Sequence, residues 1–85
     1  MPYPVIWSLK AKKLLRKIPK EISRRIVLKV KDIKENPFHY LEHYEGNDFY
    51  KLRVGDYRLL IDIDFSNKLL KIQVIGNRKD IYKNN

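Results

Sequence analysis

Cysteine is absent from this sequence, so the fold cannot depend on disulfide bonds and no thiolate zinc site can form. No apolar run is long enough to cross a bilayer, and the first residues do not combine a long apolar stretch with a small-residue cleavage site. A chain of 85 residues has room for one modest core and not for two. We therefore expect a single domain spanning residues 1–85, held together by packing alone, with a cytoplasmic location and no membrane contact.

Acidic residues are also scarce, with 10 Asp and Glu against 19 Lys and Arg, which gives a formal net charge of +9. Residues 1–36 hold 11 cations and 3 anions, whereas residues 37–85 hold 8 cations and 7 anions. Such an excess favours a polyanion such as nucleic acid as the partner, because cations contact phosphates and release counterions. The cations of the first half are equally compatible with solvated helix faces.

Apolar periodicity predicts a short strand at residues 3–7 and then two helices. Ser8 is a suitable N-cap for the first helix, which Pro19 ends. The second helix runs from about residue 20 to residue 35, because the residue before Pro37 avoids the helical region. The two segments form a helical hairpin with an apolar inner side and a basic outer side.

The rest of the sequence predicts a loop at residues 38–48 and then three strands. Alternating apolar and polar residues define the strands, at residues 49–54, 57–65 and 69–75. In the last strand we place Leu70, Ile72 and Val74 on the core face, with Lys71 near Asp62 or Asp64 on the other face. The result is an α+β domain: a mostly antiparallel sheet of about four strands, with the helical hairpin packed on one face and the opposite face open.

The hairpin centred on Gly55-Asp56 gathers cations on the open face. If these two residues form the loop, Arg53 faces Arg58, and strand alternation places Lys51 beside them. Like charges that face each other across a strand pair cost roughly 0.2 to 1 kcal/mol, so an anionic ligand is the natural reason for the arrangement. The simpler explanations are ordinary solvent-exposed cations, or a register slip of two residues that would separate the arginines.

A metal site is the rival interpretation of the loop, because His39 and His43 are spaced as H-x-x-x-H. That spacing brings two imidazoles together only on a helix, and the segment between Pro37 and Gly46 is short for one. The aromatic residues of the same loop could stack on bases or cap the core. We therefore expect a loop that packs on the core or touches RNA, and no bound metal.

Two motifs, K-x-R-V-G-D-Y-R at residues 51–58 and V-I-G-N-R-K-D-I-Y at residues 74–82, carry a resemblance to a known family. Together with the opening strand that runs into WSLKAKKLLRKI, they make nearly the whole chain similar to the RelE/ParE superfamily of toxin-antitoxin toxins, and more closely to its RelE branch. The resemblance implies a RelE-like fold and a toxin that a cognate, RelB-like antitoxin neutralises.

Members of the RelE branch with nuclease activity cleave messenger RNA in the ribosomal A site without a metal. The resemblance therefore implies a metal-independent endoribonuclease that inhibits translation, with the ribosome and mRNA as partners and no cofactor. Carried over by motif, the implied catalytic residues are Lys51, Arg53, Arg58, Arg78 and Tyr82.

Metal-free cleavage uses the ribose 2′-hydroxyl as nucleophile, so the protein must remove its proton, stabilise the phosphorane and protonate the leaving oxygen. We assign Arg53 and Arg58 to charge stabilisation, because a planar guanidinium can bind two phosphate oxygens, and Arg78 to the phosphate or the leaving group. Tyr82 is a candidate base if neighbouring cations favour its phenolate, and Lys51 is the other candidate. The simpler role for Tyr82 is packing of its ring on the sheet.

Two other functions stay open. A toxin of the ParE branch acts by binding a protein target such as gyrase, without nuclease chemistry, and a similar fold does not decide between the branches. A basic RNA-binding module without toxicity would show salt-dependent RNA affinity and no growth arrest.

Overall fold

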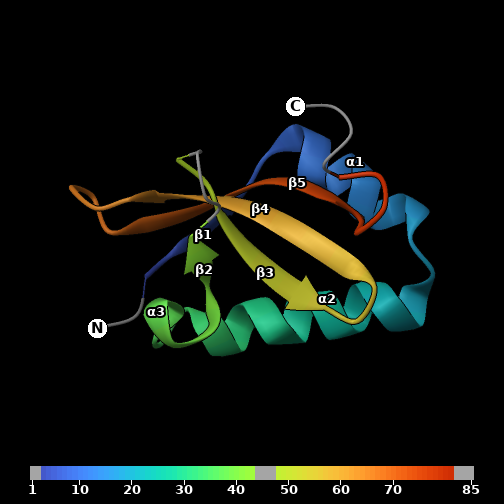
Figure 1. Cartoon of the computed structure of the whole chain (residues 1–85), viewed down its shortest axis with the longest axis horizontal. Coiled ribbons are helices and arrows are strands. Elements are labelled where there is room, and N and C mark those ends of the chain that lie inside the picture. Colours follow the sequence, from blue (N-terminus) through green and yellow to red (C-terminus); the bar gives the residue numbers. More distant parts are fainter. Residues whose placement is uncertain (1–2, 44–47, 82–85) are drawn as a thin grey trace.

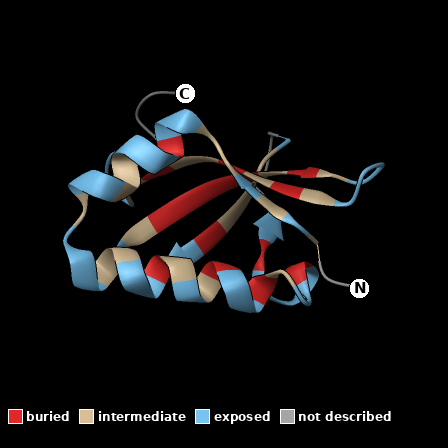
Figure 2. Cartoon of the chain, turned by 180° about the vertical axis from the view of Figure 1, so that it is seen from behind, coloured by how far each residue is buried: buried red, intermediate tan, exposed pale blue. Residues whose placement is uncertain are grey.

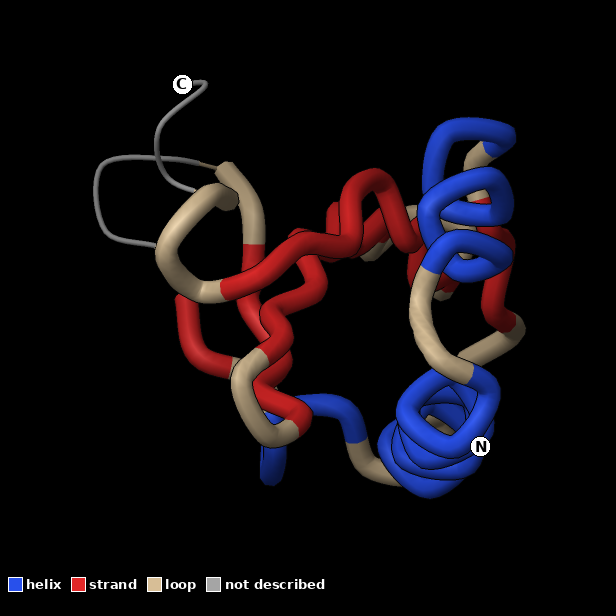
Figure 3. The backbone as a smooth tube through the Cα atoms, turned by 90° about the vertical axis from the view of Figure 1, so that its right-hand side faces the viewer, coloured by secondary structure: helices blue, strands red, loops and turns tan. Residues whose placement is uncertain are grey.

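The computed structural model describes residues 3–43 and 48–81. Its elements, in chain order, are β1 (Val5–Trp7), α1 (Leu9–Lys17), α2 (Lys20–Ile33), α3 (Pro37–Tyr40), β2 (Glu42–His43), β3 (Tyr50–Val54), β4 (Tyr57–Asp64) and β5 (Leu69–Asn77). The predicted α+β class is confirmed, with a mostly antiparallel sheet and both long helices on one side of it (Figure 1 and Figure 3). None of the helices in the described ranges is long and apolar enough to span a bilayer.

The sheet has five strands within the described residues, in the order β1-β5-β4-β3-β2, and β1 and β5 form the parallel pair. Our expectation of about four strands and of a loop at residues 38–48 was therefore incomplete. That segment contains the four-residue helix α3 and the two-residue strand β2, which pairs Glu42 with Lys51 and His43 with Tyr50. Elements this short contain too few residues to show a hydrophobic periodicity in the sequence.

Serine side chains fix the helical hairpin to the sheet and to itself. Ser8 is the N-cap of α1 as predicted: its Oγ accepts a hydrogen bond from the Ala11 N–H at 2.9 Å. The same hydroxyl donates to the Gln73 carbonyl at 2.8 Å, which joins the start of α1 to β5. Ser23 donates to the Leu15 carbonyl at 2.8 Å, so the first turns of α2 are tied to the end of α1.

The core lies between the sheet and the inner faces of the helices, where Figure 2 shows the buried segments of α2 and the central strands facing each other. Its largest fully buried side chains are Ile26, Ile33, Leu52, Leu59, Ile61, Leu70, Ile72 and Ile75. The predicted alternation of β3 and β4 is confirmed, because the core face carries the odd-numbered positions of β4 and the even-numbered positions of β3.

The predicted register of β5 was wrong at its C-terminal end. Leu60 pairs with Val74 and Ile61 pairs with Ile72, so a bulge leaves Gln73 without a partner on β4. The extra residue reverses the alternation beyond it. Val74 therefore faces the side opposite the core, and Ile75 is the residue that enters the core, at 2% exposure.

The earlier half of β5 agrees with the prediction. Lys71 pairs with Asp62 in the register, and its Nζ lies 3.8 Å from the Asp64 carboxylate. This cross-strand contact joins opposite charges on the face away from the core.

Candidate functional site

The register of the β3–β4 hairpin is the one that the sequence predicts. Arg53 pairs directly with Arg58, and Lys51 pairs with Leu60. Gly55 has a φ of 58° at the first central position of the turn, a conformation that glycine adopts without steric cost. The face opposite the core therefore carries Lys51, Arg53 and Arg58, as expected.

Arg58 is nevertheless not the exposed cation that we predicted. Arg58 is only 8% exposed, and its Nη1 donates hydrogen bonds of 2.9 Å to the carbonyls of Gly55 and Tyr57. Burial and two carbonyl acceptors hold the guanidinium in place at the hairpin tip, whereas Arg53 opposite it is exposed. The two arginines thus differ in hydrogen bonding within the chain and in access to a ligand.

Lys51 has a carboxylate neighbour that the sequence did not indicate. Its Nζ lies 3.8 Å from the Glu42 carboxylate on β2, and the two side chains are 29% and 57% exposed. An ion pair this open to solvent contributes little to stability. Lys51 is therefore the one member of the predicted set, within the described residues, whose charge is offset by an ion pair.

Arg78 is anchored beside the same hairpin turn by its backbone. Its N–H donates to the Asp56 carbonyl at 2.8 Å. The turn that follows β5 is held by Asn77, whose side chain accepts from the Lys79 N–H at 3.0 Å and whose carbonyl accepts from Ile81 N–H at 2.9 Å. Arg78 is exposed, so its side chain is free to reach a ligand at this end of the sheet.

The lack of a bulky side chain at Gly76 lets this turn fold back onto the sheet. Gly76 pairs with Arg58, and a Cβ placed on it would lie 3.4 Å from the Cβ of Ile81. Ile81 is 7% exposed and lines, with Leu60 and Val74, a mainly apolar hollow of about 320 Å³ that α1 also borders. The closing motif therefore has a structural role as well as a predicted catalytic one.

The other predicted residues divide into two groups. Tyr82 lies outside the described residues. His39 is on α3 and His43 is on β2, and their ring centroids lie 4.7 Å from that of Tyr40 and 5.0 Å from that of Tyr50 respectively. Over residues 3–43 and 48–81, no group of three His, Asp or Glu side chains could hold a metal ion.

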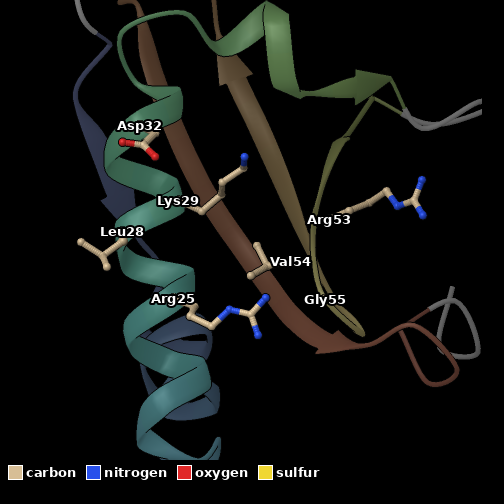
Figure 4. Close-up of a pocket in the computed structure, with 7 residues that line it drawn as sticks. All are labelled: Arg25, Leu28, Lys29, Asp32, Arg53, Val54 and Gly55. Carbon is tan, nitrogen blue, oxygen red and sulfur yellow. The ribbon is translucent and has the colours of Figure 1, made fainter.

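Two cations outside the predicted set lie close to the site. Arg25 and Lys29 of α2 line, together with Arg53, a cleft of about 320 Å³ between that helix and the end of β3 (Figure 4). Their spacing of four residues places them on one face of the helix, which was the available signal. Their position opposite the hairpin depends on how α2 crosses the sheet, which the sequence does not show.

The family of the chain follows from a match over most of its length. The model of the ParE toxin of the type II toxin-antitoxin system parDE matches residues 5–82. The chain belongs to this family of toxins, within the RelE/ParE superfamily. Among curated proteins, no sequence matches this chain closely enough to be called a relative.

Solved structures give the same fold. The chain is similar to a chain of the RelBE2 toxin-antitoxin complex from Mycobacterium tuberculosis, with 27% identity, coverage of 92% of this chain and 100% of that chain, and a TM-score of 0.82. For the archaeal RelE-RelB complex from Pyrococcus horikoshii the identity is 25%, the coverage 94% and 99%, and the TM-score 0.77. For a chain of the RelB-RelE complex from Methanococcus jannaschii, the identity is 22%, the coverage is 94% of this chain and 98% of that chain, and the TM-score is 0.75. A likeness at this level of identity shows the fold alone. The RelE-like fold that the motifs implied is thereby confirmed.

Proposed function

We propose that this type II toxin is a ribosome-dependent endoribonuclease that cuts mRNA by attack of a ribose 2′-hydroxyl on the adjacent phosphate. The observation that carries the proposal is the convergence of Arg53, Arg58 and Arg78 on one hairpin turn, from three different strands or their ends. Preorganised cations stabilise charge that develops in a transition state without reorganising at the moment of reaction. A phosphorane is a transition state of that kind.

The two paired arginines suit different parts of this reaction. Arg53 is exposed and has no ion pair within the described ranges, so it can bind two oxygens of the scissile phosphate. Arg58 is held by hydrogen bonds to two carbonyls, so it supplies a fixed positive charge beside Arg53 without needing to contact the phosphate. Arg78 would contact the phosphate or the leaving oxygen, and Tyr82 or Lys51 would take the proton of the 2′-hydroxyl.

The partners follow from the same proposal. The ribosome and its bound message would supply the RNA in the cytoplasm, and a cognate antitoxin would neutralise the toxin. The solved relatives named above are toxin-antitoxin complexes, which supports such a partner here. Because the toxin carries a net charge of +9, we expect the segment of the antitoxin that covers the site to be acidic.

A second candidate is a ParE-type toxin that acts by binding gyrase without cutting RNA. The matching family model is that of the ParE toxin, and the burial of Arg58 is also compatible with a purely structural role for this residue. A likeness of fold does not separate these activities.

Two assays on purified toxin distinguish the candidates. A nuclease cuts message on translating ribosomes and leaves DNA supercoiling by gyrase unchanged, and Tyr82→Phe lowers cutting because the candidate base is lost. The ParE-type candidate predicts the reverse, namely intact message and inhibited supercoiling.

A further inference from the structure

A groove on the helix side of the β3–β4 hairpin lies beside the proposed catalytic set and shares only Arg53 with it. Its main cleft, of about 320 Å³, is lined by Arg25, Leu28, Lys29, Asp32, Arg53, Val54 and Gly55. A second hollow of about 180 Å³ shares Arg25, Val54 and Gly55 with it and continues past the turn to Tyr57. The two hollows therefore adjoin between α2 and the hairpin tip, and we treat them together as one groove that an extended polymer could follow.

The cations of this groove are free to bind an anion. Within the described residues, Arg25, Lys29 and Arg53 make no ion pair with a carboxylate, and none of the three donates a side-chain hydrogen bond. Lys29 lies 4.3 Å above the ring of Tyr40, which leaves its N–H donors available. Asp32 is the one carboxylate that lines the cleft, so positive charge is in excess there.

The groove is separated from the catalytic face by a single strand edge. β2 pairs with β3 only at Tyr50 and Lys51, so the same edge of β3 has no partner strand farther along among the described residues. Figure 4 shows the Arg25 side chain directed toward Gly55, while Arg53 extends from β3 away from α2. A polymer that passes over this edge can contact Arg53 on one side and Arg25 on the other.

We propose that the groove binds the sugar-phosphate backbone of RNA, with Arg25 and Lys29 holding phosphates that flank the one at Arg53. The inference rests on the proposed function in that it extends the same RNA across the strand edge. Lys29 lies roughly 6 Å farther along the helix axis than Arg25, so the two cations can take different phosphates.

The test compares charge-matched pairs of substitutions on one helix. The groove variant is Arg25→Gln with Lys29→Gln, and the control is Arg24→Gln with Lys31→Gln, two exposed cations of α2 that do not line the groove. The probe is a fluorescently labelled single-stranded RNA of about ten nucleotides, bound to the isolated toxin and followed by anisotropy at several salt concentrations. Thermal unfolding of each variant confirms that the fold is retained.

Loss of two phosphate contacts weakens binding about tenfold or more at low salt. It also lowers the slope of log affinity against log salt by about 1.4, because each contact to a single strand contributes about 0.7. The control pair changes affinity by less than about threefold, because non-specific attraction falls with net charge alone. Equal losses in the two variants, or no measurable binding by the unsubstituted toxin, overturn the proposal.

Two further measurements separate this inference from its alternatives. With ribosome-bound message, the groove variant raises KM and leaves kcat unchanged, whereas a loss in kcat alone contradicts a binding role. If the groove variant loses affinity for a poly-glutamate peptide and keeps its affinity for RNA, the groove is a protein-binding surface and the proposal fails. RNA binding that depends on the groove, without any cleavage, rejects the proposed nuclease and retains the groove.

Discussion

Arg53 and Arg58 are direct partners across the β3–β4 hairpin. Arg53 is exposed, whereas Arg58 is buried, at 8% exposure, and donates hydrogen bonds to two carbonyls. Like charges opposite each other destabilise a strand pair, so the arrangement needs a compensating interaction. For Arg58 the compensation is internal, since its Nη1 donates hydrogen bonds to the Gly55 and Tyr57 carbonyls. For Arg53 none is present among the described residues, which makes it the member of the pair that is free to bind an anion.

This difference predicts unlike effects of removing the two side chains. Arg58→Ala costs about 1–3 kcal/mol of unfolding free energy, because two hydrogen bonds of a charged, buried group are lost. Arg53→Ala changes the unfolding free energy by less than about 0.5 kcal/mol, because its side chain is exposed. Urea denaturation measures both values.

Arg58→Lys separates the structural role of Arg58 from its charge. The variant keeps the positive charge but cannot reproduce the planar guanidinium that bonds to the carbonyls. We expect part of the stability loss of Arg58→Ala and a clear loss of cleavage. Equal stability of the Ala and unsubstituted proteins would show that the two carbonyl bonds contribute nothing.

Gly76 is predicted to tolerate alanine and to reject valine. Because the alanine Cβ would lie 3.4 Å from the Ile81 Cβ, that contact is tight but acceptable, whereas the added methyl groups of Gly76→Val must displace Ile81. Displacement of Ile81 would shift the turn that carries Arg78. We expect Gly76→Val to lose about 1–3 kcal/mol of stability and most of the cleavage activity, as measured by thermal unfolding and message cutting. Full activity of the valine variant would show that the turn does not position Arg78.

Glu42 is predicted to weaken RNA binding rather than to support the fold. Its ion pair with Lys51 is long and exposed, so Glu42→Gln changes stability by less than about 0.5 kcal/mol. Removal of a carboxylate beside the phosphate path tightens RNA binding about two- to fivefold, as measured by anisotropy. Glu21→Gln, an exposed carboxylate on α2, is the charge-matched control. Equal gains in both variants would mean that only net charge matters.

The turn between β4 and β5 predicts that the stability of the fold depends on the protonation of Asp64. Hydrogen bonds from the side chain and the backbone N–H of Asn67, each 3.0 Å long, lower the pKa of Asp64 below its ordinary value of 3.8. Just below pH 3.8 the unfolded chain therefore binds more protons than the folded chain does. The stabilisation from Asp64 is complete above that pH, and it is lost as the pH falls through the pKa that Asp64 has in the folded protein. Asn67→Ala raises the pKa of Asp64 toward 3.8 in an NMR titration. An unchanged titration would assign the shift to another group.

Much of the fold could be predicted because its strongest signals are local. Gly55-Asp56 fixed the loop length of the hairpin, and the alternation on both sides of it then fixed the register, including the Arg53–Arg58 pair. Ser8 and Pro19 marked the ends of α1 for equally local reasons.

The errors in the prediction arose where tertiary packing, and not the local sequence, determines the structure. The bulge at Gln73 reverses the faces of β5 after the point where Ser8 bonds to the Gln73 carbonyl, and a uniform alternation could not reveal it. The burial of Arg58 goes with hydrogen bonds from its guanidinium to two carbonyls of the turn, which depend on the folded geometry of the hairpin tip. Strand parity gave the correct face for Arg58 but not its degree of exposure.

The most direct test of the account is cleavage of ribosome-bound message by the unsubstituted toxin and by Arg53→Ala, with primer extension to map the cuts and analysis of the chemical ends. We predict cuts on the ribosome that leave 2′,3′-cyclic phosphate ends, because the 2′-hydroxyl is the nucleophile, and a rate at least tenfold lower for Arg53→Ala at unchanged stability. Intact message, or equal cutting by a folded Arg53→Ala variant, would contradict the claim that the cations of this hairpin form an RNA-cleaving site.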